Sequence, residues 1–168
     1  MKLHQIAFAA AAALIGSQAS ALSITDTNAS GTVKVYASGA SAVSNVLAGV
    51  FVQNCASNLD IYGSKAGAGN TDANNGDSYR VYSCTLKNDA DLDTDLKGKG
   101  LGGRNVALWK RDAGGSAYGV FPVALGQLSN DLVISSTSCT TTGSVASYNA
   151  GASRPTFSFT CTDVETVR

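Results

Sequence analysis

The sequence predicts an α/β fold, in which a mixed sheet is flanked by helices and followed by a β-rich excursion near the C-terminus. Two observations predict it. Segments at 33–37, 79–85 and 106–109 are rich in β-branched and aromatic residues, as strands are. The segment at 41–56 has the apolar spacing of a helix, and a short helix is expected at 116–128. A chain of 168 residues fits one domain once a leader is removed, since domains commonly have about 100–150 residues.

The first 21 residues have the pattern of an export signal. Lys2 precedes an apolar stretch over residues 6–15, and residues 19–21, Ala-Ser-Ala, form a small-residue cleavage site. This stretch is too short to span a bilayer, which needs roughly 20 residues. We therefore expect a periplasmic or extracellular protein that is not inserted in a membrane, with a polar, flexible leader over residues 22–32.

The helix expected over residues 41–56 begins with Ser41 as its N-cap and ends near Ala56. Its apolar residues follow the i, i+3, i+4, i+7 spacing of an amphipathic helix, and we expect this stripe to pack on the sheet. The stripe consists of Val43, Val46, Leu47, Val50, Phe51 and Cys55.

The rest of the chain divides into a lobe and a tail. Residues 63–77 are polar and glycine-rich, which predicts a loop, and Pro122 must interrupt or kink the second helix unless it lies in the first turn. We expect an α/β ligand-binding lobe over residues 33–128. A Ser/Thr-rich β excursion follows over residues 129–168, with short strands at 132–135 and 156–160.

Four cysteines in an exported chain favour disulfides. We expect Cys55 to pair with Cys84, and Cys139 with Cys161, because each pair closes a short loop, which the chain-entropy model values at about 3 kcal/mol. No two cysteines have the spacing of a zinc knuckle, so we expect no metal site.

Composition excludes several classes of function. The only histidine, His4, lies in the expected export signal, which excludes Ser-His-Asp and Cys-His catalysis and histidine-ligated metals. The 12 basic and 12 acidic residues give no net charge, so no long-range field attracts nucleic acid. An enzyme would need two acids facing one pocket, and only Asp112 is suitably placed. We expect a protein that is not an enzyme.

Two apparent motifs have ordinary explanations. Residues 98–103 satisfy G-x-G-x-x-G but precede a strand, whereas a dinucleotide fingerprint follows one, so we expect a surface turn. The alternating aspartates at 89–95 lack the glycine and glutamate of an EF-hand loop, so we expect a solvated acidic face.

Residues 105–119 contain the pattern on which we base a candidate binding site. A nearly all-apolar run ends in two cations, a carboxylate, two glycines and a hydroxyl. We expect the buried strand to deliver Lys110, Arg111 and Asp112 to the edge of the sheet, and the glycines to let the backbone approach a ligand. Ser116 would open the next helix, where unpaired N–H groups and the helix dipole favour an anion.

A second strand-turn-helix junction, over residues 33–43, repeats this design. Two such turns facing one cleft would hold a small oxyanion through hydroxyls, backbone N–H groups and the charge of Arg111 or Lys110, with no cofactor. The expected ligand-binding residues are Ser38, Gly39, Ala40, Ser41, Lys110, Arg111, Asp112, Gly114, Gly115 and Ser116.

At these two turns the chain resembles the phosphate-binding proteins of bacterial ABC importers, members of the type II periplasmic binding protein superfamily. Residues 38–42, Ser-Gly-Ala-Ser-Ala, resemble the Gly-Ala-Gly-Ala-Thr turn of that family. Residues 110–116, Lys-Arg-Asp-Ala-Gly-Gly-Ser, resemble its Arg-Ser-Asp-Gly-Ser-Gly-Thr segment. The resemblance implies a type II-like lobe that binds phosphate without catalysis and passes it to a membrane permease.

Two alignments of the second segment are open. Aligned on Asp112, Lys110 stands at the arginine of the family; aligned on Arg111, the aspartate position becomes Ala113. The aspartate of the family accepts a proton from bound phosphate, which lets such a site reject fully ionised sulfate. The two alignments therefore imply different selectivity among oxyanions.

The resemblance covers only a first lobe, whereas the binding proteins of that family have two. We therefore expect a truncated chain, or a fragment of a longer protein, that is a monomer. The alternative function is a ligand-free extracellular surface or matrix protein on the same scaffold, with the Ser/Thr/Gly-rich segments making the contacts.

Overall fold

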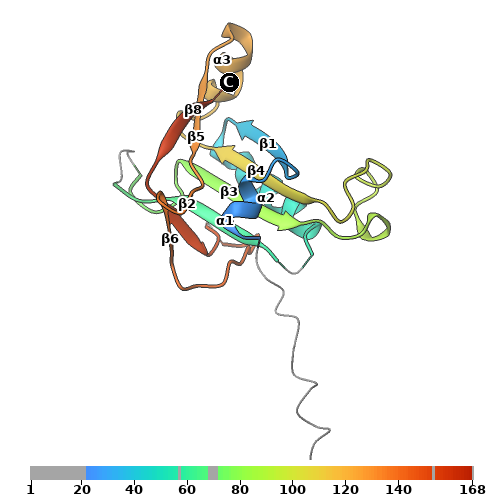
Figure 1. The fold of residues 1–168 in the computed structure, drawn as a ribbon. Helices are drawn as coiled ribbons and strands as arrows, with labels where there is room; N and C mark the ends of the chain where they lie inside the picture. Colours follow the sequence, from blue (N-terminus) through green and yellow to red (C-terminus); the bar gives the residue numbers. More distant parts are fainter. Residues whose placement is uncertain (1–21, 57, 68–71, 153, 168) are drawn as a thin grey trace, which may run out of the picture.

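The computed structural model describes residues 22–56, 58–67, 72–152 and 154–167. The export signal expected over residues 1–21 lies outside the described residues. Within them the chain has a mixed α/β fold, in which a strand-based mixed sheet is flanked by few helices (Figure 1). The expected fold class is confirmed at this level.

The strands of the main sheet are β1 (Val33–Ser38), β2 (Asp60–Ser64), β3 (Tyr79–Thr85), β4 (Asn105–Arg111), β6 (Cys139–Thr141) and β7 (Phe159–Cys161). Their order is β1-β4-β3-β2-β7-β6. The pairs β1-β4 and β2-β7 are parallel, and the other neighbours are antiparallel. Strands β5 (Ser129–Leu132) and β8 (Val164–Val167) form a separate antiparallel sheet.

The strand β4 separates two apolar layers. On one face, Trp109 belongs to a buried cluster against which Ile24 of α1 (Ile24–Asn28) packs. On the other face, Leu108 packs with Ala48 of α2 (Ser44–Gln53). Successive residues of a strand point to opposite faces, so α1 and α2 cover opposite faces of the sheet, as Figure 1 shows.

The strands expected at 33–37, 79–85 and 106–109 are confirmed as β1, β3 and β4. However, β4 does not end at Trp109, because it continues through Arg111 along both of its neighbours. Lys110 and Arg111 are therefore part of the pleated strand.

The segment over residues 22–32, expected to be a flexible leader, instead contains α1. Ser23 caps this helix through its side chain, which accepts a hydrogen bond from the Asp26 N–H at 3.0 Å. Thr27 is fully buried and donates to the Ser83 hydroxyl at 3.1 Å. The polar residues of this segment are used for capping and for buried hydrogen bonds, which their composition alone does not reveal.

The helix expected from Ser41 is present as a 3₁₀ turn, Ser41–Val43, followed by α2. Two details were wrong. Ser41 is not the N-cap, because Ala40 is the N-cap of the 3₁₀ turn and Val43 is the N-cap of α2. The buried positions of α2 are Ser44 and Ala48, whereas Val46 is 66% exposed. Small residues face the sheet because they allow the helix to approach it closely.

The helix α3 (Ala117–Leu125) confirms the helix expected within 116–128 and contains Pro122. It ends at Gly126, whose φ of 59° is left-handed. None of its residues is buried, and it extends away from the main sheet, at the top of Figure 1.

The loop expected over residues 63–77 was partly wrong, since its first residues belong to β2. All five residues of β2 are buried. A Cβ at Gly63 would lie 2.7 Å from the Phe157 ring, so glycine here makes room for an aromatic side chain.

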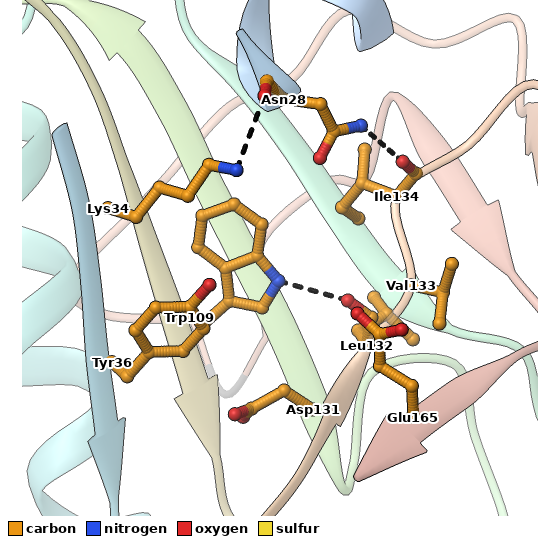
Figure 2. A pocket seen from close by; sticks show the side chains of 9 residues that line it. All are labelled: Asn28, Lys34, Tyr36, Trp109, Asp131, Leu132, Val133, Ile134 and Glu165. Atoms are coloured by element: carbon orange, nitrogen blue, oxygen red, sulfur yellow. Dashed lines mark hydrogen bonds between the residues drawn. The ribbon is translucent and has the colours of Figure 1, made fainter. Parts of the chain in front are cut away.

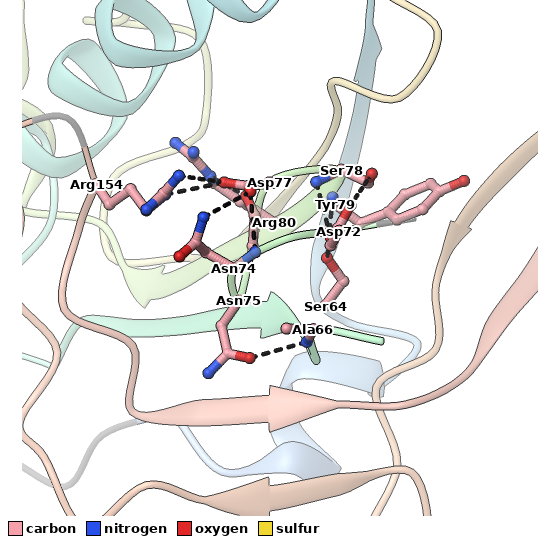
Figure 3. A network of polar contacts seen from close by, with 11 residues as sticks. Ser64, Ala66, Asp72, Asn74, Asn75, Asp77, Ser78, Tyr79, Arg80 and Arg154 are labelled. Atoms are coloured by element: carbon pink, nitrogen blue, oxygen red, sulfur yellow. Dashed lines mark hydrogen bonds and ion pairs between the residues drawn. The ribbon is translucent and has the colours of Figure 1, made fainter. Parts of the chain in front are cut away.

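The described part of this loop is held by polar contacts (Figure 3). Asp72 is buried and accepts hydrogen bonds from the Ser64 and Ser78 hydroxyls. Farther out, Arg154 forms an ion pair with Asp77 at 2.8 Å, with the Arg154 side chain 42% exposed. The loop is therefore tied to β2 and to the segment before β7.

The expected β excursion over residues 129–168 was only partly right. Strands β5 and β8 form their own sheet, whereas β7 pairs with β2 and extends the main sheet. Strand β6 pairs with β7, and Cys139 lies directly opposite Cys161.

Both expected disulfides, Cys55–Cys84 and Cys139–Cys161, are confirmed. They are consistent with an exported protein. No helix among the described residues has the length and apolar character to cross a membrane.

Candidate functional site

The two turns proposed to bind an anion lie side by side. Strands β1 and β4 are parallel neighbours, and Ser38 is the register partner of Arg111. The Gly39 N–H donates to the Arg111 carbonyl at 3.2 Å. Residues 38–41 and 111–116 therefore leave the same edge of the sheet from adjacent strands.

The two cations do not point to the same place. Lys110 is 2% exposed and lies on the α2 side, where its Nζ donates to the carbonyls of Gly39 at 3.3 Å and Arg111 at 2.9 Å. Arg111, the next residue of the strand, points to the opposite face. One small anion cannot contact both side chains at the turns.

Lys110 forms a buried ion pair with Oδ1 of Asp112. The same oxygen accepts a hydrogen bond from the hydroxyl of Ser44, the first residue of α2, at 2.5 Å. A carboxylate of the chain thus lies at the start of α2, where the helix dipole favours negative charge.

The second carboxylate oxygen of Asp112 is different. Oδ2 is buried and has no hydrogen-bond partner among the described residues. Leaving a buried acceptor unsatisfied costs about 1–3 kcal/mol or more for a charged group. Asp112 therefore keeps one buried acceptor unpaired in the second turn.

Arg111 is held by aromatic and hydroxyl groups. Its guanidinium lies 4.1 Å from the centroid of the Tyr118 ring, and its Nη1 donates to the Ser129 hydroxyl at 3.1 Å. Its Nε is buried without a partner in the described part of the chain. Arg111 is thus anchored against α3 and β5.

Three of the expected ligand-binding residues contact the protein itself. Ser38 donates its hydroxyl hydrogen bond to the Tyr118 carbonyl at 2.7 Å. A Cβ at Gly114 would lie 2.0 Å from the Tyr118 ring, so this glycine admits a side chain of α3 where we expected a ligand. Gly39 likewise allows close contact with Gly119, because a Cβ at Gly39 would lie 3.3 Å from the Cα of Gly119.

The remaining donors of the turns are open. For residues 40, 41 and 116, the described structure contains no hydrogen bond from the backbone N–H. The hydroxyls of Ser41 and Ser116 are likewise unbonded within it, and both residues are exposed. Gly115 has a φ of +63° and open space around it. These groups could donate to an anion.

Two contributors, Ser44 and Tyr118, were missed by sequence analysis. Ser44 could have been found as the polar member of the small-residue positions at 44 and 48. No sequence pattern marks Tyr118. Its ring occupies the space that a Cβ of Gly114 would fill, and Gly114 has a left-handed φ of +81°.

The other acidic and glycine-rich motifs make structural contacts and turns. Asp93 accepts hydrogen bonds from the side chains of Gln53 and Asn54, at 3.1 and 2.7 Å. Gly98, Gly100 and Gly103 have left-handed φ angles typical of turns. Across the described ranges, no three acidic, histidine or cysteine residues are grouped as metal ligands would be.

Comparison with known proteins adds no relative to this geometry. No family model, no curated protein and no solved structure matches the chain.

Proposed function

We propose that this is an exported solute-binding protein that holds a small oxyanion such as phosphate, as the receptor component of an ABC-type importer. The ligand would bind where residues 40–42 and 112–116 meet, on a lobe like those of type II periplasmic binding proteins. The single observation that carries the proposal is the buried acceptor Oδ2 of Asp112, which has no hydrogen-bond partner among the described residues.

A protonated oxyanion suits this acceptor. Hydrogen phosphate has an O–H group that can donate to Asp112, and its other oxygens can accept from the N–H groups of Ala40, Ser41 and Ser116. Sulfate is fully ionised near neutral pH, so one of its oxygens would face the carboxylate without a proton. The site would therefore favour phosphate over sulfate.

Lys110 is the cation nearest this site, where it would act through its charge, because its three N–H donors are used by Gly39, Arg111 and Asp112. It contacts both Gly39 in the first turn and Asp112 in the second, whereas Arg111 lies against Tyr118. This geometry favours the alignment on Asp112, with Lys110 at the position of the arginine in phosphate-binding proteins.

Calorimetry tests the proposal. Wild-type protein should release heat with phosphate and bind sulfate roughly tenfold or more weakly, since a charge-assisted hydrogen bond contributes about 1.5–3 kcal/mol. Asp112→Asn should weaken phosphate binding and reduce the difference between the phosphate and sulfate affinities. Arg111→Ala should keep phosphate affinity within about threefold, because the guanidinium does not face the turns.

A matched control is Asp163→Asn, an exposed carboxylate far from the turns in the sequence, which should leave both affinities unchanged. Absence of phosphate heat in wild type, or equal phosphate and sulfate affinities, would reject the proposal.

A second candidate function is the ligand-free surface or matrix protein. It is favoured by the exposed apolar residues of α3, among them Phe121 at 48% and Val123 at 86% exposure. Large exposed apolar patches mark contact surfaces. Light scattering would distinguish the two: concentration-dependent assembly without phosphate heat supports this candidate.

A further inference from the structure

A pocket of about 90 Å³ lies on the face of the sheet opposite Lys110 (Figure 2). Tyr36 of β1 and Trp109 of β4 are register partners and line one wall. Asp131 of β5 and Glu165 of β8 line the other. This pocket is separate from the two turns and from Asp112.

The two acids are placed against each other. Asp131 and Glu165 are direct partners across the β5-β8 pair, so their side chains share a face. Like charges directly opposite in a sheet are destabilising. A cation between them would remove this repulsion.

The carboxylate of Asp131 also lacks a hydrogen-bonded partner among the described residues. Asp131 is 5% exposed, yet its carboxylate makes no hydrogen bond or ion pair with any described residue. In Figure 2 it projects into the pocket below the Trp109 ring, and no contact is drawn to it. A buried carboxylate that faces a pocket in this way is an acceptor available to a ligand.

The cations near the pocket are engaged elsewhere. Lys34 donates its Nζ hydrogen bond to the Asn28 carbonyl at 3.2 Å, at the opposite end of the pocket from Asp131 (Figure 2). The Arg111 guanidinium donates to Ser129 and packs on Tyr118. Burial, as the main cause, raises the pKa of Asp131 to about 6; the Arg111 charge opposes this shift and Glu165 adds to it.

The aromatic wall suits a cation that carries an alkyl chain. The Tyr36 and Trp109 rings stack at 5.2 Å between centroids, and Tyr36 is 52% exposed. Trp109 is fixed by the hydrogen bond from its Nε1 to the Leu132 carbonyl at 2.9 Å. Aromatic faces attract cations and cover apolar chains.

The donor set fits an ammonium group better than a metal ion. The carbonyls of Leu132 and Ile134 already accept hydrogen bonds, from Trp109 and Asn28. Two carboxylates remain, and the described residues offer no group of three acidic, histidine or cysteine ligands here. A primary ammonium has three N–H donors, which two carboxylates and one hydroxyl could satisfy.

We propose that this pocket binds the primary ammonium group of a small amine, with Asp131 and Glu165 as charged acceptors, the Tyr36 hydroxyl as the third, and the stacked rings along the alkyl chain. This ligand site is independent of the oxyanion site, because Asp112 contacts the α2 side of the sheet.

Trp109 provides the measurement, since it is the only tryptophan of the chain and lines the pocket. Its fluorescence is followed during titration with n-butylamine at pH 7 and constant ionic strength. The expected result is a saturable change. The comparison ligands are n-butanol, which has no charge, tetramethylammonium, which has no N–H donor, and calcium chloride; none should saturate the signal.

Variants test the two acids. Asp131→Asn and Glu165→Gln should each weaken n-butylamine binding roughly tenfold, as expected for the loss of a charged hydrogen-bond acceptor. Asp163→Asn, an exposed acid between β7 and β8, should leave the affinity unchanged. The heat released on phosphate binding should be the same in all three variants as in wild type, which distinguishes this proposal from the oxyanion site.

Thermal unfolding monitors the fold of each variant, and Glu165→Gln, at an exposed position, carries the test if Asp131→Asn does not fold. Several results would overturn the proposal: no saturation with n-butylamine, an equal response to n-butanol, tetramethylammonium or calcium, or unchanged affinity in Glu165→Gln.

Discussion

Lys110 and Arg111 are consecutive residues, yet they lie on opposite faces of the sheet, Lys110 against Asp112 and Arg111 against Tyr118. The cause is the length of β4, which continues through both residues. The separation leaves one cation beside the turns and places the other beside β5.

The buried ion pair should be sensitive to loss of one partner. Lys110→Met leaves Asp112 as an uncompensated buried charge, so we expect a loss of about 3–5 kcal/mol in the free energy of unfolding by urea. The double variant Lys110→Met/Asp112→Leu should recover most of it. Arg154→Met, which breaks the exposed pair with Asp77, should cost at most about 1 kcal/mol. Equal losses in the two single variants would contradict the burial of the Lys110 pair.

Two adjacent glycines should respond differently to alanine. Gly114→Ala places a Cβ inside the Tyr118 ring and adds backbone strain, so we expect a loss of about 2–4 kcal/mol in unfolding free energy. Gly115→Ala adds strain alone, because the space around it is open, and should cost about 1 kcal/mol. The double variant Gly114→Ala/Tyr118→Ala should be more stable than Gly114→Ala. If Gly115→Ala is the more damaging change, the packing of Tyr118 on Gly114 is wrong.

Sequence patterns predicted the elements that have a clear period. The alternation of β1, the apolar run of β4 and the spacing of α2 each reflect a repeated requirement for burial. In contrast, β2 was missed because Gly63 resembles a loop residue, although it is there to admit Phe157. The glycine is needed for a contact with a residue that is distant in the sequence.

The sequence predicted that the two turns lie close together, as the pairing of β1 with β4 confirms, but it did not predict their contacts. Ending the strand at Trp109 left Lys110 and Arg111 free to point the same way, and the alternation rule separates them only once β4 is known to be longer. The roles of Ser44 and Tyr118 depend on how α2 and α3 approach the strand ends. Such tertiary contacts have no local pattern.

The disulfides should contribute substantially to stability. Removing Cys139–Cys161 with the double variant Cys139→Ser/Cys161→Ser should lower the unfolding free energy by about 3 kcal/mol, since it closes a loop with a sequence separation of 22 residues. Peptide mapping without reduction should first recover Cys55 linked to Cys84, and Cys139 linked to Cys161. Any cross-linked peptide between the two pairs would contradict the topology.

Stability should change with pH through Asp131. Burial, as the main cause, raises the pKa of this carboxyl to about 6 from its ordinary value of 3.8, so the folded state binds a proton more readily than the unfolded state. Stability from this group is therefore greatest below about pH 4 and falls as the pH rises towards 6, by roughly 1–3 kcal/mol. Urea unfolding of wild type and Asp131→Asn between pH 4 and 7 measures it. The unfolding free energy of Asp131→Asn should increase relative to that of wild type as the pH rises. Parallel pH profiles of the two proteins would refute the raised pKa of Asp131.

The most direct test of oxyanion binding at the two turns is a titration of ¹⁵N-labelled protein with phosphate, followed by the amide signals. We predict that the N–H signals of Ala40, Ser41 and Ser116 shift together along one saturation curve, and that an equal concentration of sulfate leaves them in place. Signals at the turns that stay fixed, while phosphate shifts only amides elsewhere, would contradict the proposed site.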